Sequence, residues 1–180
     1  MPLNTFLLMQ RNVVRNFGEV SWTIIADAGR IQGRLFLRRE LARKGAKRSA
    51  YTLQQALPLI SFCGLGEPAL VRYKEAKGQA IFQLPACPLC LQHKKLFGKS
   101  KEPVHEYLRG FCTGMCEEMW GKAAVSLTHA SGADGDAQCI IEVRLPAAED
   151  EDVPLADFGR IERIIEKTYR CTGMGQTRVT

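Results

Sequence analysis

The stretch from Pro103 to Arg144 constrains the fold more than any other part of the chain. In its first half, apolar residues recur at spacings of three, four and seven, which predicts an amphipathic helix that ends near Gly121. Gly110 and Gly114 lie four residues apart within this helix, where each glycine costs about 1 kcal/mol relative to alanine. A cost of this size predicts a packing role, in which another backbone approaches the helix closely.

A hairpin is predicted directly after this helix. Polar and apolar residues alternate from Ala123 and again from Ala137 to Leu145, as in strands that bury one face. Asp134-Gly135 lies between the two runs and supplies the residues of a tight turn. The helix and the hairpin therefore form one predicted unit.

The segments before and after this unit supply further helices and one more hairpin. Gly29 and Gly33 interrupt the first long helix, where they allow a kink or close packing against another helix. The fold class that follows is α/β in the α+β sense, with an antiparallel sheet of two hairpins packed against helices. The predicted elements are helices over residues 19–44, 53–62 with Thr52 as cap, and 157–171, strands over 69–75 and 79–84, and a short helix that opens at Pro88.

The chain has 180 residues and 46% hydrophobic content, which suffices for one domain with a core. We expect a leader over residues 1–16, the main domain over 17–146, and an acidic link with a C-terminal helix over 147–180 that packs on the same domain. No apolar run approaches the ~20 residues that cross a bilayer. The N-terminal segment also lacks a basic leader with a cleavage site. A cytoplasmic protein is therefore expected.

The net charge of +6 is concentrated in basic runs near residues 34–48 and 94–101. No interleaved aromatic residues or nucleic-acid-reading motif accompany these runs, so we expect solvated helix faces and no nucleic-acid or membrane partner. Glu117 and Glu118 are likewise expected on a solvated face. No Walker loop, dinucleotide fingerprint or Gly-x-Ser-x-Gly motif is present, which removes the usual support for kinase, dehydrogenase and hydrolase functions.

Seven cysteines form an odd set in a chain expected to be cytoplasmic, which argues against a complete disulfide framework. Cys87 and Cys90 have the two-residue spacer of metal sites, and Cys112 and Cys116 lie one helical turn apart. These four thiolates are one candidate zinc site, with an iron-sulfur cluster as the lesser option. Two alternatives remain open: a Cys87 thiolate resolved by Cys90 in redox chemistry, and cysteines that are simply buried apolar residues.

The chain resembles a known family in two respects. These are its glycine-containing motifs and the order of its predicted elements, which is helix, helix, hairpin, helix, hairpin. Over about residues 17–145 the chain resembles the 4-vinyl reductase domain family, whose fold also occurs in small subunits of the TRAPP vesicle-tethering complex. The motifs that carry the resemblance are Ala28-Gly29-Arg30 with Gly33, Gly64-Leu65-Gly66, the small residues after Leu84, Gly110-Phe111-Cys112-Thr113-Gly114, Trp120-Gly121 and Gly135-Asp136-Ala137-Gln138-Cys139.

The resemblance implies a domain that binds small hydrophobic or hydrocarbon-like molecules as a sensor or carrier, and it implies a homodimer. We therefore expect a binding protein more than an enzyme, with an apolar pocket between the glycine-containing helix and the hairpins. The competing function is a cysteine-dependent enzyme or thiol-redox protein of related fold. The predicted pocket residues are Phe111, Met115, Met119 and Trp120.

Phenol-responsive sensors that look similar to this family hold a structural zinc ion. The resemblance places two of their zinc ligands at His105 and Cys139, and the other two at Thr128 and Ser131, which are poor zinc ligands. The cysteine pairs are candidates to rebuild the site. The full set of candidate metal ligands is Cys87, Cys90, Cys112, Cys116, His105 and Cys139.

Overall fold

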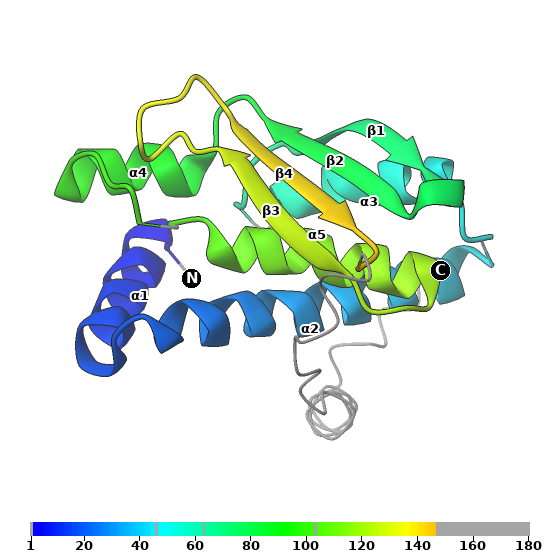
Figure 1. The fold of residues 1–180 in the computed structure, drawn as a ribbon, viewed down its shortest axis with the longest axis horizontal. Coiled ribbons are helices and arrows are strands. Elements are labelled where there is room, and N and C mark those ends of the chain that lie inside the picture. The colour runs from blue at the N-terminus through cyan, green and yellow to red at the C-terminus, as the bar shows by residue number, and fades with distance from the viewer. Residues whose placement is uncertain (1, 46, 63, 103, 147–180) are drawn as a thin grey trace, which may run out of the picture.

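The computed structural model describes residues 2–45, 47–62, 64–102 and 104–146 (Figure 1). These ranges contain five α-helices and one four-stranded sheet, so the predicted α+β class is confirmed. The predicted C-terminal helix over 157–171 lies outside the described residues. The elements are α1 (Leu3–Phe17), α2 (Val20–Lys44), α3 (Ala50–Phe62), β1 (Ala69–Lys74), β2 (Gln79–Leu84), α4 (Pro88–Phe97), α5 (Glu106–Trp120), β3 (Val125–Ala130) and β4 (Cys139–Arg144).

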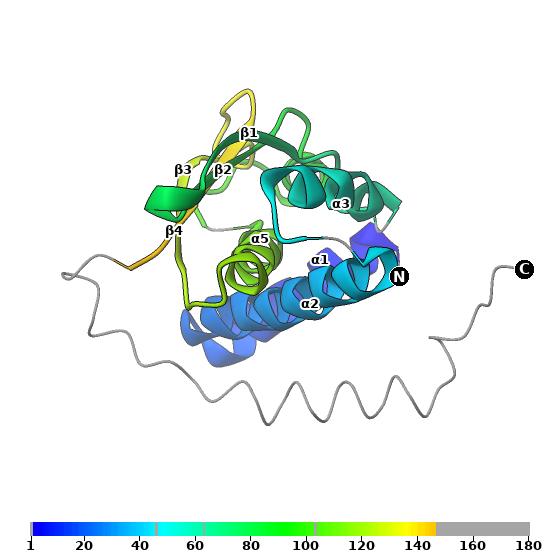
Figure 2. The same ribbon diagram turned by 90° about the vertical axis from the view of Figure 1, so that its right-hand side faces the viewer.

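Two hairpins lie side by side in the sheet, as predicted. The strand order is β1-β2-β4-β3 and every neighbouring pair is antiparallel. The central pair sets Leu84 opposite Cys139 and Phe82 opposite Ile141. Alternate residues of β2 and β4 are buried, which gives the sheet one core face. Helix α5 lies on that face, between the sheet and α2 (Figure 2).

Helices α2 and α5 pack with their backbones in direct contact. A Cβ atom added at Gly29, Gly33, Gly110 or Gly114 would lie between 1.8 and 2.1 Å from a backbone carbonyl oxygen of the other helix. Real Cβ atoms do not occupy such positions, so all four sites require glycine. This contact confirms the packing role predicted for Gly110 and Gly114. For Gly29 and Gly33 it supports close packing, one of the two alternatives.

Two carboxylates of α5 are buried against cations, which corrects the prediction of a solvated face. Glu117 is 4% exposed and forms a bidentate ion pair with Arg30 of α2. Glu118 is 9% exposed and is paired with Arg38 and Arg48. A carboxylate is costly to bury without a partner. Part of the basic run therefore neutralises a buried carboxylate of α5, although the side chains of Arg38 and Arg48 themselves stay partly exposed.

The chain start differs from the prediction as well. Residues expected to be a leader form α1, whose Leu7 and Gln10 are buried. Gln10 Nε2 donates a hydrogen bond to the Val104 carbonyl oxygen at 3.1 Å, which ties α1 to the segment before α5.

Helix α3 begins at Ala50, earlier than predicted. Ser49 Oγ, and not Thr52, accepts a backbone N–H at its start. Among the described residues, no helix has the length and apolar content needed to span a membrane.

Replacing one of the contact glycines tests the packing of α2 on α5. Gly110→Ala is expected to lower the free energy of unfolding by about 2 kcal/mol through overpacking, although alanine is the better helix former by about 1 kcal/mol. The added methyl group would lie 1.8 Å from the Ala26 carbonyl oxygen. Urea denaturation measures the change. Ala28→Ser adds one atom on the exposed side of α2 and should change stability by less than about 0.5 kcal/mol. An unchanged Gly110→Ala protein would contradict the contact.

A second variant tests the buried ion pair. Arg30→Met leaves the Glu117 carboxylate buried without its guanidinium and should cost about 3 kcal/mol of stability. Arg43→Met removes a guanidinium from the exposed pair with Glu40 on the same helix and should leave the denaturation midpoint unchanged. Equal losses in the two variants would argue that burial of the Arg30 pair is unimportant.

Candidate functional site

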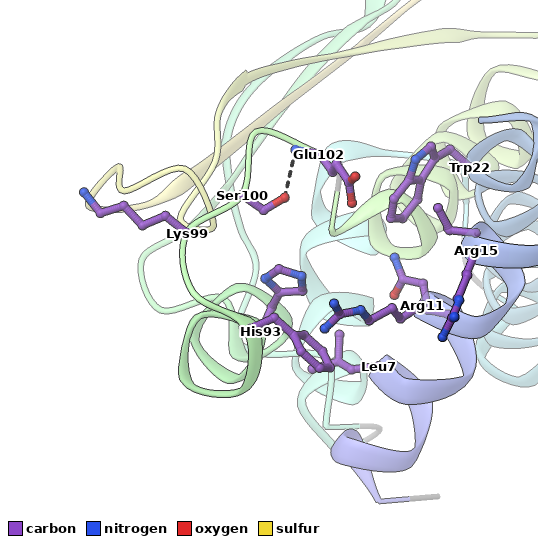
Figure 3. Close-up of a pocket in the computed structure, with 11 residues that line it drawn as sticks. Leu7, Arg11, Arg15, Trp22, His93, Lys99, Ser100 and Glu102 are labelled. Carbon is purple, nitrogen blue, oxygen red and sulfur yellow. Dashed lines mark hydrogen bonds between the residues drawn. The ribbon is translucent and has the colours of Figure 1, made fainter. Parts of the chain in front are cut away.

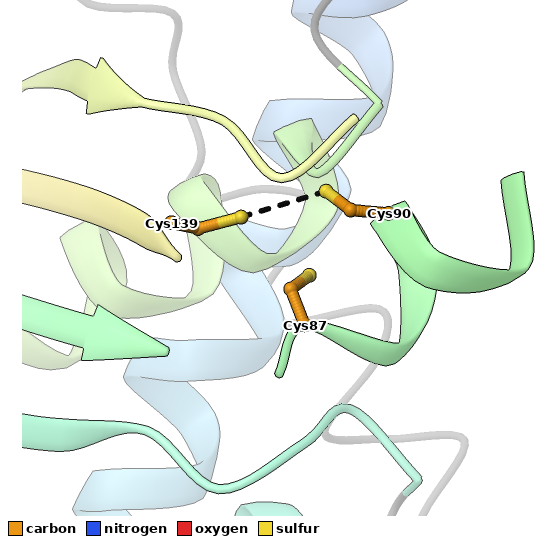
Figure 4. A group of neighbouring side chains, drawn as sticks. All are labelled: Cys87, Cys90 and Cys139. Atoms are coloured by element: carbon orange, nitrogen blue, oxygen red, sulfur yellow. Dashed lines mark hydrogen bonds between the residues drawn. The ribbon is translucent and has the colours of Figure 1, made fainter. Parts of the chain in front are cut away.

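Three cysteines from two separate parts of the chain meet at the start of α4. Cys87 precedes the helix, Cys90 lies in its first turn and Cys139 begins β4. Their Sγ atoms all lie within 4.8 Å of one another, and those of Cys90 and Cys139 are 3.5 Å apart (Figure 4). Each of the three is at most 3% exposed. The register of β2 with β4 explains the meeting, because Cys139 lies opposite Leu84 and the chain then runs directly to Cys87.

His105 lies beside this thiol cluster and is fully buried. Its Nδ1 atom is 3.6 Å from Cys90 Sγ, and its Nε2 atom is 3.3 Å from Thr128 Oγ1. In the tautomer that carries its proton on Nε2, this nitrogen donates to the threonine hydroxyl and the Nδ1 lone pair faces the thiol cluster. Metal-binding histidines are commonly oriented in this way by a partner on the second ring nitrogen. Burial lowers the pKa of His105, so the ring is neutral at pH 7.

The electrostatics of the cluster favour one thiolate. Hydrogen bonds from the Cys87 and Cys90 thiols lower the pKa of Cys139, and the Gly132 N–H also donates to its Sγ atom at 3.2 Å. The bond to Cys139 raises the pKa of Cys90 to about 12, and bonds to Cys139 and Cys90 raise the pKa of Cys87. The thiol cluster therefore concentrates negative charge on buried sulfur, the setting in which a cation binds.

The structure combines candidate ligands that the sequence had placed in separate sets. Cys87 and Cys90 come together with Cys139, and His105 lies next to them. Cys112 and Cys116 are fully buried in α5. Among the described residues, the thiol cluster consists of Cys87, Cys90 and Cys139 and does not include these two. Burial raises the pKa of Cys112 to about 12 and that of Cys116 well above its ordinary value, so both stay protonated at neutral pH and are poor nucleophiles.

The four residues predicted to line an apolar pocket belong to the core or pack against it. Phe111, Met115 and Met119 are at most 5% exposed. Trp120 is partly buried, stacks on Tyr73 and donates its Nε1–H to the tyrosine hydroxyl at 3.1 Å. Their contact with a ligand stays a prediction.

A cavity that the sequence analysis missed lies between α1 and α4, with a volume of about 450 Å³ (Figure 3). Residues 7, 10, 11, 14 and 15 of α1 form one wall, and His93 and Phe97 of α4 form another. Trp22 and residues 99, 100 and 102 complete the lining. Burial lowers the pKa of His93. The regular spacing of Leu7, Arg11 and Val14 was the sequence signal for this wall, but these residues had been assigned to a leader.

Helix α4 carries both features. Cys90 contributes to the thiol cluster and His93, about one helical turn later, lines the cavity. Anything that fixes the start of α4 therefore also positions one wall of the cavity.

No family model matches the sequence, and no curated protein matches it. Solved structures do match. The phenol-responsive sensory domain of the transcription activator PoxR, crystallised with phenol, has a TM-score of 0.71 and 16% identity, over 92% of this chain and 81% of that one.

Two further structures are similar at lower scores. A trafficking protein particle complex subunit 3 from Naegleria fowleri, covalently bound to palmitic acid, has a TM-score of 0.54 and 13% identity, over 81% of this chain and 95% of that one. A vinyl-4-reductase family protein from Methanocaldococcus jannaschii has a TM-score of 0.54 and 16% identity, over 82% of this chain and 83% of that one. The chain therefore shares its fold with these three proteins.

Proposed function

We propose that this chain is a small-molecule-binding domain, of sensor or carrier type, in which Cys87, Cys90, Cys139 and His105 hold a structural zinc ion. The observation that carries the proposal is the convergence of three buried thiols and an oriented imidazole at the start of α4. Three sulfur ligands and one histidine nitrogen are a common structural zinc set. An iron-sulfur cluster is less well suited, because it is usually held by four cysteines.

A zinc ion would supply a cross-link and no chemistry of its own, because four protein ligands leave no open position for substrate. Such a cross-link would join α4, the residue before α5 and the first residue of β4. Metal binding of this kind adds directly to the folding free energy. Since α4 also lines the cavity, the metal would hold one wall of the binding site in place.

Binding of a small hydrophobic molecule is supported by the cavity and by the shared fold, which in two other proteins accommodates phenol or palmitic acid. The cavity between α1 and α4 is the site that we propose. Phe111, Met115, Met119 and Trp120 remain a second candidate site, one that opens only if the core rearranges. A homodimer, which the family resemblance implies, and a cytoplasmic location complete the proposal.

One observation favours the competing thiol-redox function. Cys90 Sγ and Cys139 Sγ are 3.5 Å apart, so a small movement could join them in a disulfide. Against this, redox-active cysteines are commonly accessible thiolates, whereas all three sulfur atoms here are buried. A third thiol and a histidine at the same place are also unnecessary for a disulfide pair.

Elemental analysis tests the metal site. Protein purified from zinc-supplemented medium should contain close to one zinc ion per chain, and Cys90→Ser or Cys139→Ser should contain far less. Cys112→Ala is the matched control, because it removes a buried thiol outside the thiol cluster and should keep its zinc. Zinc should dissociate as the pH falls, since protons compete for the thiolates.

The same samples decide between the two functions. A metal-free protein with a Cys90–Cys139 disulfide, identified by mass spectrometry of unreduced peptides, would reject the zinc site in favour of thiol-redox chemistry. Equal zinc loss in the Cys112→Ala variant would show that the ligand set is wrong.

A further inference from the structure

We propose that the cavity between α1 and α4 selects a small amphipathic carboxylate, an apolar body that carries one acidic group. This inference deepens the proposed function, on which it rests, by naming the ligand class of that site. It follows from the cations, the unpaired acceptor and the apolar surfaces that the described residues place around one space.

Two arginines of α1 line the cavity. Arg11 and Arg15 lie one helical turn apart, at a spacing where like charges repel each other. Neither makes an ion pair with a carboxylate in the part of the chain that the structure describes, although many other arginines of this protein do. A bound anion would relieve the repulsion and satisfy both guanidinium groups.

Arg11 is held in place before any ligand binds. Its guanidinium carbon lies 4.2 Å from the centre of the Phe97 ring, within the range of a cation–π interaction. Figure 3 shows Arg11 extending from α1 toward His93 of α4. Because the side chain is already ordered, little conformational entropy is lost when it binds an acidic group. Lys99 also lines the cavity but points away from the other labelled side chains in Figure 3, so we assign the acidic group to the arginines.

One buried acceptor in the wall makes no hydrogen bond within the part of the chain that the structure describes. It is Oε1 of Gln10, a residue that is 5% exposed. The orientation of its amide is fixed, because Nε2 donates to the Val104 carbonyl oxygen, which can only accept. An unsatisfied buried acceptor is costly, and a ligand hydroxyl would satisfy it.

Apolar side chains make up much of the remaining surface. Leu7, Val14, Trp22 and Phe97 line the same cavity. Its volume of about 450 Å³ lies in the range of small-molecule sites. An inorganic anion would leave these surfaces uncovered, and a neutral hydrocarbon would leave the arginines unpaired. A molecule with both an apolar body and an acidic group covers the apolar surfaces and also pairs with the arginines.

Calorimetric titration of the full-length, zinc-loaded protein with naphthoate and its neutral analogue naphthamide tests the charge requirement. Naphthoate should bind at least tenfold more tightly than naphthamide. Arg11→Gln and Arg15→Gln should each weaken naphthoate binding about tenfold and leave naphthamide binding within twofold. Glu102→Gln removes the one carboxylate of the lining and should tighten naphthoate binding. Hydroxynaphthoate should bind more tightly than naphthoate, because its hydroxyl can reach an unpaired acceptor.

Arg72→Gln is the matched control, since it makes the same charge change on β1, outside the cavity, and should leave naphthoate binding unchanged. Inorganic phosphate at equal concentration should not displace naphthoate. Equal affinity for naphthoate and naphthamide, or an equal effect of Arg72→Gln and Arg11→Gln, would overturn the inference. So would the absence of any binding by zinc-loaded, folded protein.

These outcomes are separable from failure of the metal proposal. Protein that lacks zinc yet shows the arginine-dependent preference for naphthoate would reject the zinc site and retain the carboxylate site. Zinc-containing protein that prefers naphthamide would retain the proposed binding domain and reject the ligand class.

Discussion

The backbone contact between α2 and α5 is the constraint on which the rest of the structure depends. Glycines on both helices remove the side chains that normally hold two helices 8–10 Å apart. The close approach brings Arg30 within reach of Glu117, so the contact and the buried ion pair support each other. With α2 covering one side, α5 presents its other sides to the sheet and becomes the centre of the core.

The position of α5 also determines which groups the residues just before the helix can contact. His105 is the residue before the helix, and Val104 next to it accepts the hydrogen bond from Gln10 of α1. One short segment thus meets the thiol cluster on one side and the wall of the cavity on the other. The two candidate sites are physically connected through this segment and through α4, without any need for long-range coupling.

The sequence was sufficient for elements that depend on local pattern. The helix that contains Gly110 and the hairpin around Asp134-Gly135 were predicted because period and turn chemistry are local properties. The pairing of Glu117 with Arg30 was not predicted, because the two residues lie 87 positions apart in the sequence. The thiol cluster was predicted only in parts, since joining Cys139 to Cys87 requires the register of β2 with β4. Helix α1 was missed for a different reason: its periodicity was present, but the segment was judged by its position at the chain start.

The two tryptophans of the chain occupy very different surroundings, and this gives the protein a pair of built-in optical reporters. Trp22 lines the cavity, whereas Trp120 stacks on Tyr73 with its ring centre 6.3 Å away and donates its indole N–H to the tyrosine oxygen. Indole emission depends on the polarity around the ring, so the two residues should emit at different wavelengths. A spectral change that survives replacement of Trp120 by phenylalanine can be assigned to the cavity, and one that does not reports on the contact between β1 and α5.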